Sequence, residues 1–239
     1  AVDRVLHTAA MTSWHFMMRS AEYCAKLAKG AFDTDKVLRM KDAKFFIKGQ
    51  PTLNYARADE VRVTFGKTKT TGGGEVRAHF ATNHSCCVVR ALAELFIHGD
   101  STDAEAPLFA WPKGTDMRGE GVRYVDMVAL IKRAARYCGL EDEFYSSHSQ
   151  RRGGASGYLL SGAMNLEEVR VYGRWKSLSS LRLYIEPGMG ALAVAAQAKV
   201  LSGQEDVNMM QMEPPRERDF MRMRAAKAVK EMQKGAPSR

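Results

Sequence analysis

His148 and Arg151 place two cationic hydrogen-bond donors on one turn of the chain. An arginine side chain offers a planar fork of N–H donors, which suits a phosphate group. The residues that follow, Gly153-Gly154-Ala155, are small, so they indicate that another segment approaches the backbone closely. Taken alone, the pattern is most often a surface turn.

Three further candidates carry individually weak signals. Arg19 lies in an apolar stretch, where a guanidinium needs a partner, and Glu22, three residues later, can supply one. Trp175 and Tyr184 belong to residue types that usually lie in the core with a polar tip at its edge.

The glycine-rich segment 66–74 carries Lys67 and Lys69. A nucleotide-binding P-loop would need a glycine five positions before Gly66, where Val61 stands, and a helix after the loop, where a second β-like run follows. The pattern therefore disfavours a P-loop. From the residues alone, the other interpretation is a hairpin tip with solvated lysines.

Read in chain order, the candidates form one series. They lie in the segments MMRSAEY, GKTKT, HSQRRGGAS and GRWKSLSSLRLYIEP. The series resembles the catalytic domain of tyrosine recombinases, the phage-integrase and Cre-like family, whose pattern is Arg, Lys, His-x-x-Arg, His or Trp, then Tyr. The resemblance spans residues 19–187 and implies an α+β fold: a mostly helical catalytic domain with a small antiparallel sheet.

The resemblance implies DNA strand cleavage and rejoining in site-specific recombination or mobile-element integration. Tyr184 would attack the phosphodiester and form a 3′-phosphotyrosyl link. That link stores the bond energy, so no ATP, metal ion or other cofactor is expected.

The other residues of the series take the remaining roles that the resemblance implies. Arg19 and Arg151 would stabilise charge on the phosphate, and Glu22 would orient the groups beside it. Lys69, with Lys67 as its rival, would protonate the 5′ oxygen, while His148 would assist deprotonation of the tyrosine. Trp175 would pack beside the phosphate and donate its indole N–H. The expected DNA contacts are Lys67, Arg152, Arg174 and Lys176.

The expected partner is double-stranded DNA, bound by a homo-oligomer, a tetramer, without a membrane. Residues 1–203 would form the catalytic domain, and by the resemblance we expect the family's N-terminal core-binding domain to be absent from this sequence. The residues 204–239 would form a tail with a possible helix for docking onto a neighbouring protomer. A type IB topoisomerase or resolvase, or a domesticated non-catalytic DNA-binding module, are the alternatives. We expect an intracellular protein, nuclear if its source is eukaryotic.

The expected elements follow from periodicity and from stop signals. Helices are predicted over 9–28, 86–98, 122–138, an apolar stretch that follows Gly154 and runs to Ala163, and 178–185, the last one ended by Pro187. Asn165 and Glu168 have the spacing of a helix N-cap, and Gly173 ends that helix. The β-like runs are 37–40, 45–47, 61–65 and 76–80, of which the last two form a hairpin. The stripe Val125, Val128, Ile131, Ala135 and Cys138 is predicted as one face of the helix 122–138.

Composition agrees with a nucleic-acid partner. The chain has 239 residues, 45% of them hydrophobic, which is typical of a globular protein. Its formal net charge of +9 favours a polyanion. The sequence has no apolar run long enough for a membrane span and no helical zinc motif. Its four cysteines are interpreted as reduced thiols.

Overall fold

The computed structural model describes residues 2–25, 36–66, 72–99, 103–111 and 121–185. The chain divides into two compact units, Ala1–Leu178 and Ser179–Arg239. The first unit holds helices and a sheet of four antiparallel strands. This confirms the predicted fold class, mostly helical α+β with a small antiparallel sheet.

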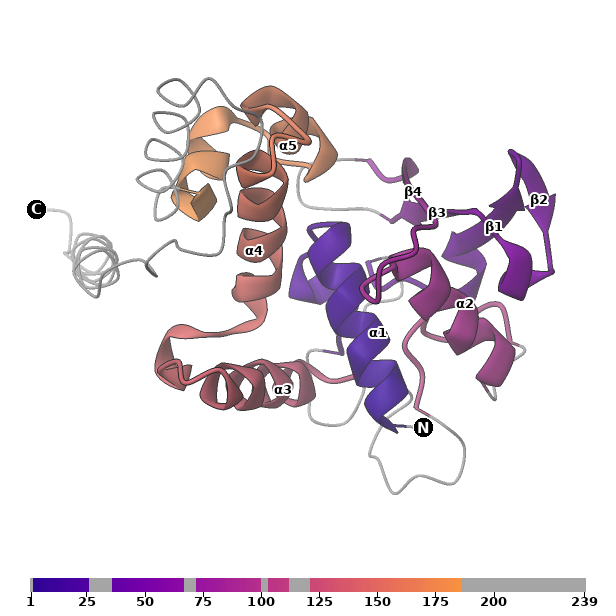
Figure 1. The fold of residues 1–239 in the computed structure, drawn as a ribbon, viewed down its shortest axis with the longest axis horizontal. Helices are drawn as coiled ribbons and strands as arrows, with labels where there is room; N and C mark the ends of the chain where they lie inside the picture. The colour runs from indigo at the N-terminus through magenta and orange to yellow at the C-terminus, as the bar shows by residue number, and fades with distance from the viewer. Residues whose placement is uncertain (1, 26–35, 67–71, 100–102, 112–120, 186–239) are drawn as a thin grey trace, which may run out of the picture. The chain divides into compact units, whose positions relative to one another are not determined.

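The described residues of the first unit form five α-helices. They are α1 (Val2–His15), α2 (Val88–His98), α3 (Tyr124–Tyr137), α4 (Ser147–Leu160) and α5 (Leu166–Tyr172). Figure 1 shows α1 between α4 on one side and α2 with the sheet on the other. The core lies around α1, α2 and the sheet, where Phe16, Phe65 and Leu92 are fully buried.

The strands run in the order β2-β1-β3-β4, so β2 and β4 form the two edges. Their bounds are β1 (Ala43–Ile47), β2 (Gln50–Thr52), β3 (Glu60–Phe65) and β4 (Glu75–Phe80). The predicted runs 45–47, 61–65 and 76–80 are confirmed as strands. The run 37–40 is wrong as a strand, because Arg39 starts the short 3-10 helix Met40–Asp42 instead.

Strand β2 was not predicted, since Gln50-Pro51-Thr52 shows no apolar alternation. It pairs with β1 through a two-residue turn, Lys48-Gly49, in which both residues have positive φ, 50° and 78°. Proline is tolerated there because β2 is an edge strand.

The predicted helix 9–28 is wrong in its second half. Helix α1 ends at His15, and Met17 takes a φ of 47°, which a helix cannot continue. The backbone N–H of Met18 then reaches back to the carbonyl of Ser13 at 2.8 Å. Arg19 consequently lies on extended backbone, as the residue that precedes the 3-10 helix Ser20–Glu22.

Glycines let α4 lie directly against the end of α1. A Cβ atom at Gly154 would lie 2.2 Å from the carbonyl oxygen of Trp14, and one at Gly157 would lie 2.7 Å from its indole ring. Both distances are far inside van der Waals contact, so larger residues would force the helices apart. The close backbone approach predicted after Arg151 is therefore confirmed, and α1 is the segment that approaches.

The predicted stripe on α3 needs a correction. The buried residues of α3 are Met127, Ile131 and Ala135, whereas Val125 and Cys138 are exposed. The two stripes share Ile131 and Ala135, but the face that packs inward starts at Met127.

In the second unit, the structure describes only residues 179–185. Residues 178–185 are helical, as predicted, and Leu181 and Ile185 are buried at the i, i+4 spacing of one helix face. Pro187, the predicted end of this helix, and the tail 204–239 lie outside the described residues. Within the described part, no helix has both the length and the apolar character that a membrane crossing requires.

Candidate phosphate site

The candidate site is built around the turn that follows α5. This helix starts as predicted: the Asn165 side chain accepts from the Glu168 N–H at 2.9 Å, and the Glu168 carboxylate accepts from the Asn165 N–H at 2.6 Å. After α5 ends, the chain turns at Gly173 and Arg174, which has a φ of 62°. The indole of Trp175 then folds over Gly173, where an added Cβ would lie 1.8 Å from the ring. Glycine is therefore required at 173.

Arg174 points into the protein. Its side chain is 0% exposed, and its Nη2 lies 2.7 Å from Oε2 of Glu22 in an ion pair. Its guanidinium also donates to the carbonyl of Phe16 at 3.2 Å and lies 3.7 Å from the ring centre of Phe65. Burial lowers the pKa of Arg174, and the Glu22 carboxylate opposes this effect. The prediction of Arg174 as a DNA contact does not fit this enclosure, because no surface of the side chain remains for DNA.

Glu22 holds a second arginine on the same carboxylate. Arg19 donates to it through its backbone N–H at 2.8 Å and through Nη1 at 3.1 Å. Thus the Arg19–Glu22 pair expected from the sequence is present, although in a 3-10 turn and not within an α-helix. Two guanidinium groups against one carboxylate leave one positive charge in excess. The side chain of Arg19 is 32% exposed, so part of this charge faces solvent.

Arg151 enters from α4 and is almost completely buried. Its guanidinium donates to the carbonyls of Met17 and Gly173 and lies 3.8 Å from the ring centre of Trp175. A cation over an indole face is attracted by the ring's electrons. Arg151 and Trp175 are therefore brought together, as the sequence series predicts.

The turn also receives Arg19. Its Nη2 donates to the carbonyl of Arg174 at 2.9 Å, next to the Gly173 carbonyl that Arg151 uses. The structure thus brings Arg19, Glu22, Arg151 and Trp175 to one place, from the end of α1, from α4 and from the turn after α5.

The remaining predicted residues are placed as follows. His148 is exposed on the first turn of α4, one turn before Arg151; Arg152 is half-buried and Lys176 is exposed. Lys67 and Lys69 lie outside the described residues. Tyr184 is half-buried in the second unit.

Sequence reasoning missed a polar cluster beside this site. On β4, Arg77 donates to the carbonyls of Val171 and Tyr172, and Nε2 of His79 lies 2.7 Å from the hydroxyl of Tyr172 in a hydrogen bond. Burial, followed by the charge of His15, lowers the pKa of His79 to about 4. The alternation of Arg77 and His79 on one face of a strand was the available signal.

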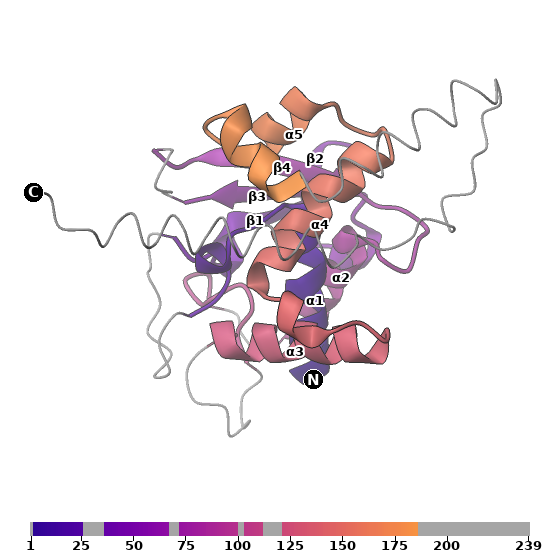
Figure 2. The same ribbon diagram turned by 90° about the vertical axis from the view of Figure 1, so that its left-hand side faces the viewer.

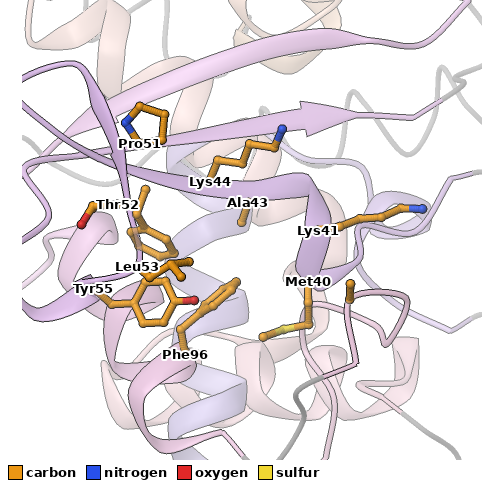
Figure 3. A pocket seen from close by; sticks show the side chains of 11 residues that line it. Met40, Lys41, Ala43, Lys44, Pro51, Thr52, Leu53, Tyr55 and Phe96 are labelled. Atoms are coloured by element: carbon orange, nitrogen blue, oxygen red, sulfur yellow. The ribbon is translucent and has the colours of Figure 1, made fainter.

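A separate hollow of about 800 Å³ lies between β1, β2 and α2. Figure 3 shows its lining, with Leu53, Tyr55 and Phe96 gathered together and the amino groups of Lys41 and Lys44 extending away from them. None of the residues in the predicted series lines this hollow. In the described ranges, no three His, Cys, Asp or Glu side chains come together as a metal site.

Comparisons with known proteins give structural neighbours only. No protein-family model and no curated protein matches the chain. The chain is similar to XerH site-specific recombinase bound to palindromic difH substrate in a post-cleavage complex, with 16% identity, a TM-score of 0.49, and coverage of 82% of this chain and 50% of that chain. A pre-cleavage complex of XerH with difH gives 17% identity, a TM-score of 0.46, and coverage of 77% and 47%. The chain therefore spans about half the length of these structures.

Proposed function

We propose that the chain cleaves and rejoins DNA strands through a 3′-phosphotyrosyl intermediate, in site-specific recombination or the integration of a mobile element. The observation that carries the proposal is the meeting of Arg19 and Arg151 at the turn of Trp175. Arg19, whose side chain is 32% exposed, can donate to a phosphodiester under attack, and the buried Arg151 adds its positive charge from beneath the same turn.

The chemistry also needs a nucleophile and a proton donor. Tyr184 supplies the nucleophile: its oxygen attacks the phosphorus, and the 5′ oxygen of the next nucleotide leaves. Lys69 gives that oxygen its proton, and the exposed His148 takes the proton of the tyrosine. Because the new phosphate ester keeps the bond energy, the reverse attack by a 5′ hydroxyl rejoins the strand.

Binding of the duplex depends on the positive charge of the chain. The net charge of +9 supports attraction to DNA, with Arg152 and Lys176 as contacts to the backbone. Recombination between two duplexes requires several protomers. The active form of the protein in this proposal is therefore a tetramer on DNA, inside the cell.

The test is an assay for a covalent protein–DNA adduct. It uses a nicked DNA duplex, on which the cleaved product is trapped. Wild-type protein should give a protein–DNA band that survives denaturation, and Tyr184→Phe should give none while it still binds DNA. Tyr137→Phe is the matched control, because that tyrosine is 93% exposed on α3 and should leave the adduct unchanged. An adduct that persists in Tyr184→Phe would remove the proposed nucleophile, and a wild-type protein that binds DNA without an adduct would favour a binding module.

A further inference from the structure

Arg77 binds the end of α5 from the edge of the sheet. Its Nε donates to the Tyr172 carbonyl at 3.0 Å and its Nη2 to the Val171 carbonyl at 2.8 Å. Glu75, on the same strand, holds the guanidinium at 3.1 Å. The last carbonyls of a helix lack partners within the helix, so a cation there is stabilised both by hydrogen bonds and by the helix dipole.

The strand that carries Arg77 is fixed against α5 at a second point. Figure 1 shows β4 as the strand nearest α5, and Figure 2 shows β3 and β1 below β4. His79, two residues after Arg77 and therefore on the same face of β4, contacts the Tyr172 hydroxyl at 2.7 Å. Two side chains of β4 thus hold the last residues of α5 against the sheet.

The carbonyls bound by Arg77 begin an unbroken series of guanidinium contacts. Arg77 takes the carbonyls of Val171 and Tyr172, Arg151 takes that of Gly173, and Arg19 takes that of Arg174. Four consecutive carbonyls are therefore held by three arginines from three distant segments. A shift at Tyr172 would move the next two carbonyls, and with them the two guanidinium groups that they position.

We propose that Arg77 is a positioning residue for strand cleavage: by fixing the end of α5, it sets the turn 173–175 on which Arg19 and Arg151 depend. The inference rests on the proposed function. Arg77 acts through the two arginines and does not itself contact the phosphate.

The fork of arginine is what the position requires. Two carbonyls on successive residues are reached by two different nitrogens of one guanidinium, whereas a lysine offers a single point of donation. Arg77→Lys therefore keeps the charge and loses one of the two contacts. Arg77→Gln loses the charge and keeps a short donor.

The experiment measures single-turnover cleavage, DNA affinity and the thermal midpoint for Arg77→Lys and Arg77→Gln. We expect cleavage to fall roughly 10- to 100-fold, because displacement of a catalytic group by about 1 Å has that size of effect. DNA affinity should stay within about twofold. Arg90→Lys is the matched control, since Arg90 also donates to a carbonyl, that of Thr82, but far from α5 in the chain.

A double-mutant cycle separates positioning from folding. In an Arg19→Ala background, the cost of Arg77→Lys should shrink, because part of its effect passes through Arg19. Full additivity, an unchanged cleavage rate, or loss of the fold in both Arg77 variants would overturn the inference. A wild-type protein without an adduct would instead be a failure of the proposed function, which the same gel reveals before any variant is compared.

Discussion

Arg19 and Arg151 donate to the carbonyl oxygens of two consecutive residues, Arg174 and Gly173. One comes from the loop after α1 and the other from the second turn of α4, and their only common feature in the sequence is the residue type. A single turn therefore sets the separation of the two guanidinium groups. The two arginines are therefore positioned together, and they differ mainly in how deeply their side chains are buried.

That difference predicts unequal effects on stability. Arg19→Ala and Arg151→Ala should each lower cleavage at least about 100-fold, since each removes a positive charge that stabilises the attacked phosphate, an effect worth roughly 3 kcal/mol. Only Arg151→Ala should also lower the thermal midpoint strongly, because its side chain is buried and holds the carbonyls of Met17 and Gly173. Single-turnover cleavage and thermal unfolding check both statements. Equal losses of DNA affinity and cleavage would instead make both residues simple phosphate anchors.

Arg174 and Lys176 form a matched pair of variants that separates the effect of a buried charge on stability from the effect of a surface charge on DNA binding. Arg174→Met should destabilise the fold by about 3–5 kcal/mol, because it leaves the buried Glu22 carboxylate without one of its partners. Lys176→Met should leave stability unchanged and reduce the slope of log K against log salt by about one. Denaturant unfolding and salt-dependent DNA binding measure the two effects. If Arg174→Met lowered the salt slope at unchanged stability, the DNA contact predicted from the sequence would be restored.

His79 predicts a loss of stability in mild acid. Its pKa is lowered from 6.5 to about 4, so between these values the unfolded chain binds a proton that the folded protein does not. Stability should therefore fall as the pH drops from about 6.5 to 4, by about 3 kcal/mol in total. The groups that face it are His15, Tyr158 and Tyr172, and the pKa of His15 is lowered too, which adds in the same direction.

The measurement is the free energy of unfolding against pH. His79→Gln should flatten the dependence in this window, while His98→Gln, at the exposed end of α2, should not. A dependence that stays steep in His79→Gln would assign the effect to other groups.

Lys69 can be tested by the chemistry of the leaving group. Lys69→Ala should cleave a normal substrate poorly, and a substrate with sulfur in place of the scissile 5′ oxygen should restore the rate, because a thiolate, with a pKa of about 8.5, leaves without a proton. The defects of Arg19→Ala and Arg151→Ala should persist on both substrates. Lys67→Ala is the control. If the sulfur substrate restores cleavage by Lys67→Ala alone, the proton donor is Lys67 and not Lys69. If it restores cleavage by neither variant, the proton donor does not come from this hairpin.

Much of the fold follows from local patterns. Apolar spacing and stop residues predict α2, α3 and α5 closely, and the alternation of side chains predicts β3 and β4. The end of α1 could not be predicted, because Met17 and Met18 continue the apolar period, whereas the helix ends at His15 and Met17 has a positive φ. Periodicity describes what a segment can bury, and only the tertiary contacts decide where it stops.

Four residues of the predicted series, Arg19, Glu22, Arg151 and Trp175, lie together in the structure, but their arrangement did not follow from the sequence. The motif Gly173-Arg174-Trp175 contains an arginine that was predicted to contact DNA. A local sequence motif does not show whether the side chain of Arg174 points to the surface or to the interior. The positive φ of Arg174 turns it inward to Glu22, a carboxylate far away in the chain. Arg77 was missed because the backbone carbonyls that it contacts cannot be read from the sequence, where its alternation with His79 was the one signal.

The row of carbonyls at 171–174 has a consequence for the order of folding. Its donors come from far along the chain, with separations of 155 residues for Arg19 and Arg174 and 95 for Arg77 and Tyr172. The entropy of closing such long loops is lost before these bonds form, which makes contacts of this kind slow. The turn should therefore acquire its native shape late, after α1, α4 and the sheet are assembled. A chain caught midway through refolding would possess most of its helices and sheet but would lack the turn on which the proposed cleavage depends, so recovery of that activity would lag behind recovery of secondary structure.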